Sequence, residues 1–379
     1  MKIVVAMDSF KGSLSAIEAC QAVKRGLLAV SPEAHVRLLP MADGGEGTAA
    51  TILAASRGMW VEIEVTGPLP SMKVRGGYAW LPDRGPGALV EMATASGLEL
   101  LRPDQLDPLA ATTLGTGEQL AAAFARGPQT VWLAIGGSAT VDGGTGAAQS
   151  LGWRFLDAQG REVESGGAGL ERIERIVAPQ ERPGRGVGIR VLCDVENPLL
   201  GERGAARVFG PQKGATSAMV DRLEMGLAAL ADAIERDLGK DVRHLPGGGA
   251  AGGLGAGAVA FLDATLVSGV EAVMDASGLD DALADADWVI TGEGRFDRQS
   301  LDGKVVSGVL SRAGLSGCRV AVVAGTVDPE AVRRARPRVD ASEVAAPREM
   351  ILSEALARGD ELLEAAAARL ATTIRHGVP

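Results

Sequence analysis

Short apolar runs alternate along the chain with segments whose apolar residues recur at helical spacing. The runs at residues 2–6, 36–40, 131–135, 189–193, 286–290 and 320–324 predict buried strands. Between the first two, Ser15 and Glu18 have the spacing of a capping box, and Ser31-Pro32 ends the helix that follows. Strands that alternate with helices predict an α/β fold with a mostly parallel sheet.

The pattern changes near residue 66 and changes back near residue 285. Residues 60–65 alternate apolar and acidic positions, as in a half-exposed strand, and Pro and Gly then punctuate residues 66–70. We expect residues 1–66 and 285–379 to form one discontinuous Rossmann/flavodoxin-like domain. Residues 67–284 are expected to form a second α/β domain inserted into it, with a cleft between the two.

A glycine-rich stretch follows the predicted strand at 131–135 and precedes a small-residue helix. It contains Gly136, Gly137, Ser138, Asp142, Gly143 and Gly144. A strand, a glycine turn and a helix start point backbone N–H groups and a positive dipole end at an anion. The stretch therefore predicts anion binding, and the alternative is a tight strand–helix turn without a ligand.

Two acidic loops follow the first two predicted strands. Asp8, Ser9 and Lys11 come after the first, and Asp43, Gly44, Gly45 and Glu46 come after the second. Loops at the carboxyl ends of strands bind ligands in open α/β sheets, so both loops are candidate site loops. The alternative makes Asp43 a turn residue and Glu46 a partner of the helix dipole.

Further candidates follow the later strands. Asp194 and Asn197 carry oxygen donors suited to Mg²⁺, and Gln212 and Lys213 lie on a loop where the lysine suits a phosphate or a carboxylate. Glu293, Arg295, Asp297 and Lys304 follow the strand at 286–290. The glycine run 247–257 either cradles phosphates or packs a helix tightly against a sheet.

Composition narrows the class of partner. The chain has 379 residues, a net charge of −10 and no block of Lys or Arg, which argues against a nucleic-acid partner. The three cysteines are far apart, and no apolar stretch is long enough to cross a membrane. We expect a cytoplasmic protein without a membrane partner.

Several common catalytic motifs are missing from the sequence. Gly303-Lys304 lacks the rest of a Walker A motif, and no HExxH segment occurs. Gly136-Gly-Ser138-Ala-Thr140 nearly matches a hydrolase nucleophile elbow, but Thr140 replaces the last glycine and no histidine lies within any motif. A serine hydrolase is therefore disfavoured.

Together the motifs resemble the bacterial type I glycerate kinases. The resemblance rests on residues 8–13, 41–48, 135–146, 193–201, 209–215 and 291–297, in that order along the chain. It implies two α/β domains around a cleft, and phosphorylation of D-glycerate with ATP and Mg²⁺, generally to 2-phosphoglycerate.

The resemblance and the residue chemistry lead to a set of expected roles. Lys11, Asp43, Asp194 and Lys213 are the expected catalytic residues, Asp194 and Asn197 the expected metal ligands, and the other candidates above the expected binding residues. Phosphoryl transfer needs charge neutralisation and positioning, which these side chains supply. The alternatives are a kinase that yields 3-phosphoglycerate or acts on a related hydroxy acid, and a nucleotide-binding regulator. Self-association into a homo-oligomer and the domain that binds adenine are left open.

Overall fold

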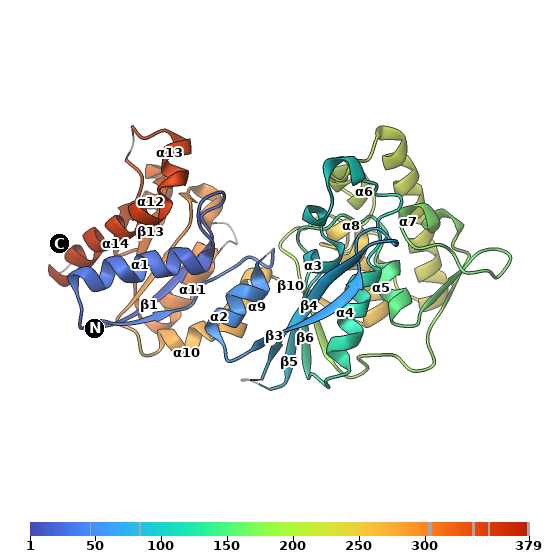
Figure 1. Cartoon of the computed structure of the whole chain (residues 1–379), viewed down its shortest axis with the longest axis horizontal. Helices are drawn as coiled ribbons and strands as arrows, with labels where there is room; N and C mark the ends of the chain where they lie inside the picture. Colours follow the sequence, from blue (N-terminus) through green and yellow to red (C-terminus); the bar gives the residue numbers. More distant parts are fainter. Residues whose placement is uncertain (46, 83–84, 302–304, 336–337, 348, 377–379) are drawn as a thin grey trace. The chain divides into compact units, whose positions relative to one another are not determined.

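The structure is a computed structural model that describes residues 1–45, 47–82, 85–301, 305–335, 338–347 and 349–376. The chain forms two compact units. Unit 1 comprises residues 1–43, 50–56 and 270–379, and unit 2 comprises residues 44–49 and 57–269. Each unit contains its own sheet, so the predicted α/β class with strands from both chain ends in one parallel sheet is confirmed (Figure 1).

The sheet of unit 1 is fully parallel, in the order β15-β13-β11-β1-β2. Its strands are β1 (Lys2–Met7), β2 (His35–Leu38), β11 (Trp288–Gly292), β13 (Arg319–Ala324) and β15 (Ala341–Val344). The apolar run of β1 is buried because this strand lies inside the sheet, where Ile3 faces Val36 on β2 and Trp288 on β11. Connections run from β1 towards β2 on one side and from β11 towards β15 on the other, so the strand order reverses between β1 and β11.

Helices cover the sheet of unit 1. They are α1 (Ala16–Val30), α9 (Gly269–Ser277), α10 (Leu279–Leu283), α11 (Val305–Ser316), α12 (Pro329–Ala335), α13 (Leu352–Ala357) and α14 (Gly359–His376). Unit 1 also contains the 3₁₀ segment η5 (Arg298–Leu301) and the short strands β12 (Arg295–Phe296) and β14 (Thr326–Val327). α1 begins at the predicted capping box of Ser15 and Glu18. α1 and α14 lie side by side (Figure 1), and a Cβ at Gly26 would come within 2.2 Å of the backbone oxygen of Glu364.

The sheet of unit 2 is mixed, in the order β10-β9-β6-β5-β4-β3. Its strands are β3 (Met59–Thr66), β4 (Lys73–Leu81), β5 (Gly87–Glu91), β6 (Thr130–Ala134), β9 (Gly188–Leu192) and β10 (Thr265–Val267). The last four are mutually parallel, whereas β3 and β4 pair antiparallel over eight residue pairs. A separate two-stranded ladder consists of β7 (Arg154–Leu156) and β8 (Arg175–Val177).

The unit boundaries differ from those expected at residues 66 and 285. The Gly-Pro segment that suggested a crossover is instead the turn between β3 and β4, in which the Gly67 N–H donates to the Met72 carbonyl over 3.0 Å. The half-exposed strand at 60–65 is β3, at the edge of the sheet of unit 2. Residues 270–284 carry α9 and α10 and belong to unit 1.

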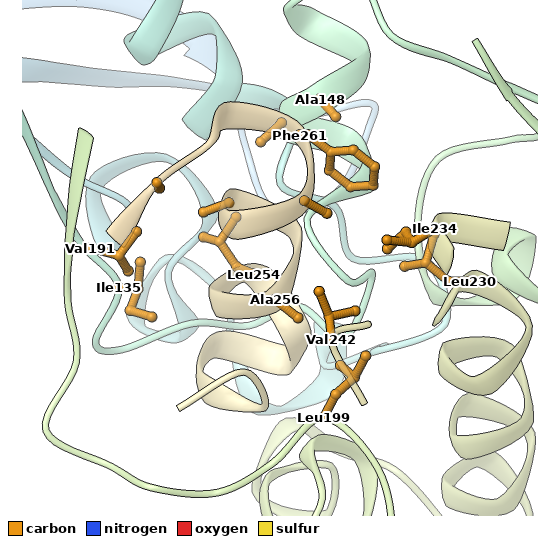
Figure 2. Packing of buried hydrophobic residues seen from close by; sticks show 14 of the residues in the cluster. Ile135, Ala148, Val191, Leu199, Leu230, Ile234, Val242, Leu254, Ala256 and Phe261 are labelled. Atoms are coloured by element: carbon orange, nitrogen blue, oxygen red, sulfur yellow. The ribbon is translucent and has the colours of Figure 1, made fainter. Parts of the chain in front are cut away.

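Helices and one large core complete unit 2. The helices are α2 (Thr48–Ala55), which begins in unit 2, α3 (Ala93–Ser96), α4 (Leu114–Phe124), α5 (Thr145–Ser150), α6 (Ala205–Phe209), α7 (Ser217–Leu238) and α8 (Ala250–Leu262), with the 3₁₀ segments η1 (Leu98–Leu100), η2 (Pro103–Gln105), η3 (Gly167–Arg172) and η4 (Pro211–Lys213). Figure 2 shows Leu254 of α8 close to Ile135 and Val191, with Leu230 and Ile234 of α7 also in the core. This core lies within residues 61–266, all inside unit 2.

Candidate functional site

A cavity of about 580 Å³ opens at the carboxyl ends of the strands of unit 1. Asp8 follows β1, Glu293 follows β11, and both line the cavity together with Asp43. Three of the predicted site loops, far apart in the sequence, therefore meet in one pocket. A second cavity of about 420 Å³ lies at the opposite edge of this sheet, near Lys2 and His35, and is lined by no predicted site residue.

The carboxyl group of Asp8 has an unusual environment in the pocket. The pKa of Asp8 is raised to about 7, mainly by burial and also by the nearby carboxylates of Asp43 and Glu293, against the opposing effects of the Ser9 N–H and Lys11. The Ser9 N–H donates to Asp8 Oδ1 over 2.7 Å. Because its pKa lies near neutrality, Asp8 can gain or lose a proton at physiological pH.

The pocket lining contains both polar and apolar side chains. Lys11 and Arg295 are exposed, and Arg295 Nε lies 3.2 Å from Asp297 Oδ2. The apolar lining residues include Phe10 and Leu356. The backbone carbonyl of Leu356 accepts a 2.7 Å hydrogen bond from Ser13 Oγ, which ties α13 to the loop after β1.

Unit 2 gathers polar groups at the carboxyl ends of its own parallel strands. Asp194, two residues after β9, accepts hydrogen bonds through Oδ1 from Ser268 Oγ at 2.9 Å and from the Gly269 N–H at 3.0 Å. Ser268 and Gly269 directly follow β10, so the adjacent strand ends hold the Asp194 carboxylate. Gly44 is buried beside them, and a Cβ there would lie 2.9 Å from Gly269 Cα.

Glu91 is a residue of this edge that the sequence interpretation missed. It is the last residue of β5, is only 6% exposed, and accepts a 2.5 Å hydrogen bond from the Gly47 N–H. It thereby holds the loop that contains Gly45. A charged residue at the end of an otherwise apolar strand was the signal that could have found it, because an unpaired buried carboxylate is costly.

Lys213 was expected on a loop, suited to a phosphate or a carboxylate, but the structure buries it. The residue is 2% exposed on η4, and its Nζ donates to Ser138 Oγ and to the Thr140 carbonyl, each over 2.7 Å. Burial lowers the pKa of Lys213 to about 7, against the opposing effect of Asp142. Lys213 therefore holds the loop after β6 from inside, while neighbouring Gln212 is exposed.

The side chain of Asp142 accepts hydrogen bonds from backbone N–H groups at the start of α5, where the sequence predicts that an anion binds. This fully buried carboxylate accepts hydrogen bonds from the N–H groups of Thr113, Gly144 and Gly146 and from Thr113 Oγ1. Burial raises the pKa of Asp142, and these donors oppose the rise. Asp142, Gly143 and Gly144 thus lie in a tight turn between β6 and α5 whose backbone N–H groups bond to Asp142.

The surface part of the predicted anion loop is Gly136 and Gly137. Gly137 is exposed, Gly136 half-buried, and Ser138 8% exposed. The Gly137 carbonyl accepts from the Leu98 N–H over 2.8 Å, so the segment after α3 supports this turn. Among the six residues predicted here, these three lie at the carboxyl-end edge of the sheet.

The glycine run 247–257 packs elements together. A Cβ at Gly257 would lie 2.2 Å from the Gly143 carbonyl oxygen, and one at Gly252 would lie 2.0 Å from that of Thr140. Gly252 and Gly253 have positive φ angles of 66° and 92°, which glycine adopts without strain. These glycines of the run therefore pack closely against the turn at residues 140–144.

The expected metal ligands of unit 2 have separate surroundings. Asn197 donates through Nδ2 to the Arg203 carbonyl over 2.8 Å, and Asp194 faces the strand end after β10. The described part of the chain contains no cluster of three or more His, Cys, Asp or Glu side chains able to hold a metal ion. Glu46 and Lys304 lie outside the described residues, so the structure does not place these two candidates.

The described helices include none that is both long and apolar enough to cross a lipid bilayer. Each of the two units has polar loops at the carboxyl ends of parallel strands, which is typical of α/β proteins that bind small polar ligands at these strand ends.

Comparison with known proteins identifies the family within this class. The sequence profile of the glycerate kinase family matches residues 3–375, and the chain belongs to that family.

Individual relatives agree with this assignment. The chain is 43% identical to a glycerate kinase of Bacillus subtilis (strain 168), over 99% of this chain and 98% of the relative. It is 46% identical to the glycerate 2-kinase of Escherichia coli (strain K12), over 83% of this chain and 82% of the relative. A crystal structure from Salmonella typhimurium LT2, assigned as a glycerate kinase 2, superposes with a TM-score of 0.88 at 44% identity, covering 100% of this chain and 99% of that one. The resemblance seen in the sequence motifs is confirmed.

Proposed function

We propose that this protein transfers the γ-phosphoryl group of ATP to the 2-hydroxyl of D-glycerate, giving ADP and 2-phosphoglycerate. The observation that carries the proposal is the pocket of unit 1, where the loops of Asp8, Asp43 and Glu293 meet. All three loops lie within residues 3–375, the range that the glycerate kinase family profile matches. The name of the Escherichia coli relative supports the 2-hydroxyl as the acceptor.

The chemistry assigns simple tasks to the side chains. The hydroxyl oxygen of glycerate forms a bond to the γ-phosphorus, the bond from phosphorus to the leaving oxygen of ADP breaks, and the hydroxyl proton passes to a carboxylate. We propose Asp194 or Asp43 as the acceptor of this proton. Lys11 and Arg295, both exposed, are cations able to offset phosphate or carboxylate charge.

We further propose that Mg²⁺ binds together with ATP. Mg²⁺ in kinases is commonly held by one or two carboxylates together with the substrate phosphates, so a complete protein cage is not needed. Asp194 fits this pattern, because its carboxylate is exposed and oriented by Ser268 and Gly269. Asn197 is the second proposed ligand. When bound, the ion neutralises negative charge on the phosphates.

Lys213 has a different proposed role from the contact with substrate expected of it. Its two hydrogen bonds orient Ser138 and the Thr140 carbonyl, next to the exposed turn of Gly136 and Gly137. We therefore propose Lys213 as a positioning residue for that turn. The backbone of Gly136 and Gly137 is the part of the glycine-rich stretch that we propose to face an anionic substrate group.

The test of the activity is ADP release from MgATP with D-glycerate, followed by phosphorus NMR of the product. We expect turnover and a phosphate signal on the secondary hydroxyl. A phosphate signal on the primary hydroxyl would confirm the kinase activity but contradict transfer to the 2-hydroxyl. Parallel assays with other small hydroxy acids show whether glycerate is the preferred acceptor. ATP binding without turnover on any of them would instead indicate a nucleotide-binding regulator.

Asp194→Asn tests the proposed role of that carboxylate. The variant keeps the size of the side chain and removes its charge, so we expect kcat to fall by roughly 10²-fold or more. Asp221→Asn on α7, whose side chain is 65% exposed, is the matched control and should keep normal kcat. Near-normal turnover of Asp194→Asn would remove this residue from the mechanism.

A further inference from the structure

The pocket of unit 1 lies where the order of the strands reverses. The chain runs outward from β1 to β2 on one side and from β11 to β13 and β15 on the other. In open parallel sheets the loops at such a point diverge and leave a crevice outside the carboxyl ends of the strands. Asp8 and Glu293, which follow β1 and β11, both line the cavity.

The size and the lining of this pocket favour a small molecule with one apolar part. About 580 Å³ lies within the range of small-molecule sites. One wall consists of apolar side chains from Ala345 to Leu362, and Leu352 at this wall is 72% exposed. An exposed large apolar side chain beside a cavity indicates a surface that a ligand can cover.

The lining of the pocket is also rich in carboxylates. Asp8, Asp43, Glu293 and Asp297 line the pocket, against two cations, Lys11 and Arg295. This balance disfavours an anion as small as glycerate, whose whole body is polar and charged. Carboxylates do suit sugar hydroxyl groups, which donate hydrogen bonds to them, as the acidic residue of dinucleotide-binding folds does to a ribose.

We propose that this pocket binds the nucleoside half of ATP, with the purine against the apolar residues of α13 and its neighbours and the ribose hydroxyls towards the carboxylates of Asp8 and Glu293. The assignment rests on the proposed kinase function for the identity of the nucleotide. It answers which unit binds adenine, a question that the sequence leaves open. The exposed cations Lys11 and Arg295 are the groups of this pocket available to the phosphates.

Ala355→Trp tests the proposal by filling the pocket from its apolar wall. Ala355 lines the cavity on α13 and is partly exposed, whereas Ala357, two residues further on the same helix, is exposed and does not line it. The Kd for ADP is measured by calorimetry without glycerate, and the KM values for ATP and D-glycerate are measured separately. We expect Ala355→Trp to raise the Kd for ADP and the KM for ATP at least 10-fold, with the KM for D-glycerate within about 2-fold of normal. Ala357→Trp should leave all three unchanged.

Leu352→Asp provides a second variant that does not depend on filling the cavity. Because Leu352 is largely exposed, its replacement preserves the fold, and circular dichroism checks this. We expect weaker ADP binding, by about 5-fold or more, from the loss of apolar contact with the base.

The outcomes separate this proposal from the proposed function. Unchanged ADP binding in both variants, or a rise in the KM for D-glycerate alone, would overturn the nucleoside assignment. Neither result would contradict the proposed kinase activity. ADP binding that Ala355→Trp weakens, in a protein that phosphorylates no hydroxy acid, would support the assignment and contradict the kinase. A wild-type protein that binds neither ADP nor ATP would overturn the nucleoside site directly.

Discussion

The carboxyl group of Asp8 lies near two other carboxylates, those of Asp43 and Glu293, and is largely removed from water. A folded-state pKa of about 7, against an ordinary value of 3.8, means that folding favours the protonated form. The contribution of Asp8 to stability is therefore complete below pH 4 and disappears as the pH rises through 7. At neutral and alkaline pH this position destabilises the fold, which is a common property of functional sites.

Asp8→Asn should make this cost visible. An amide carries no charge to desolvate. We therefore expect the free energy of unfolding of the variant to exceed that of the wild type at pH 8 by up to about 4 kcal/mol, and the two values to become equal near pH 4. Urea unfolding at several pH values measures the difference. Asp285→Asn, at a side chain 76% exposed, is the control. A stability difference that does not change between pH 4 and pH 8 would contradict the raised pKa.

Lys213 predicts the opposite pH dependence. Its folded-state pKa of about 7 lies below the ordinary value of 10.5, so the unfolded chain binds the extra proton between these values. The wild type should therefore gain stability relative to Lys213→Met as the pH rises from 7 to 10, by about 1–4 kcal/mol. Lys73→Met, at an exposed lysine of β4, controls for the loss of one charge.

The same variant tests the positioning role of Lys213. Met fills a similar volume but donates no hydrogen bond, so Ser138 and the Thr140 carbonyl lose their donor. We expect kcat to fall by roughly 10-fold or more at a temperature where the variant is fully folded. Normal kcat together with a lower melting temperature would leave Lys213 with a structural role alone.

These two residues also show where sequence interpretation stops. The position of Asp8 directly after an apolar run was enough to predict that it lies in a strand-end loop. The burial of Lys213 depends on Ser138, 75 residues earlier in the chain, and no local pattern encodes that contact. Glu91 was missed for a similar reason, because its partner Gly47 is 44 residues away.

At the scale of elements, the glycines of α8 determine how closely this helix packs. α8 is buried along residues 252–258, and its backbone approaches that of the turn at 140–144. A methyl group does not fit at Gly257, because its carbon would lie 2.2 Å from a backbone oxygen. Small residues at this contact are thus required by geometry.

Gly257→Ala should accordingly destabilise unit 2. We expect a loss of about 3 kcal/mol from displaced backbone, measured by thermal and urea unfolding. Gly314→Ala on α11 is the matched control, since a Cβ there meets no atom within 4 Å. That change should be neutral or stabilise by up to about 1 kcal/mol, because alanine favours the helix. Equal stability of the two variants would contradict the close packing.

The alternation of apolar runs was sufficient to predict most strands of both sheets. It could not reveal which strands pair, because pairing depends on contacts between distant segments. The hairpin of β3 and β4 is an example: the Pro-Gly segment looked like a crossover between domains, and only the antiparallel register from Met59 with Trp80 to Thr66 with Lys73 identifies it as a turn within unit 2.

At the scale of the whole molecule, the two units differ in continuity. Unit 2 is nearly one stretch of chain, and its core lies entirely between residues 61 and 266. A fragment of residues 57–269 should therefore fold alone, with cooperative unfolding and dispersed amide signals in NMR spectra. The fragment 1–56 should stay unfolded, because β1 lacks β11. A fragment 57–269 without cooperative unfolding would show that unit 2 needs the rest of the chain.

The interior place of β1 has a consequence for the order of events on the ribosome. β1 leaves the exit tunnel before unit 2, but β11, the strand with which it pairs through Ile3 and Trp288, is translated only after all of unit 2. At elongation rates of about 5–20 residues per second, this delay is roughly 15–60 s. During that time the nascent chain exposes an apolar strand with an open edge, a feature that attracts chaperones and promotes aggregation. The pocket that begins with Asp8 can assemble only after most of the message has been read.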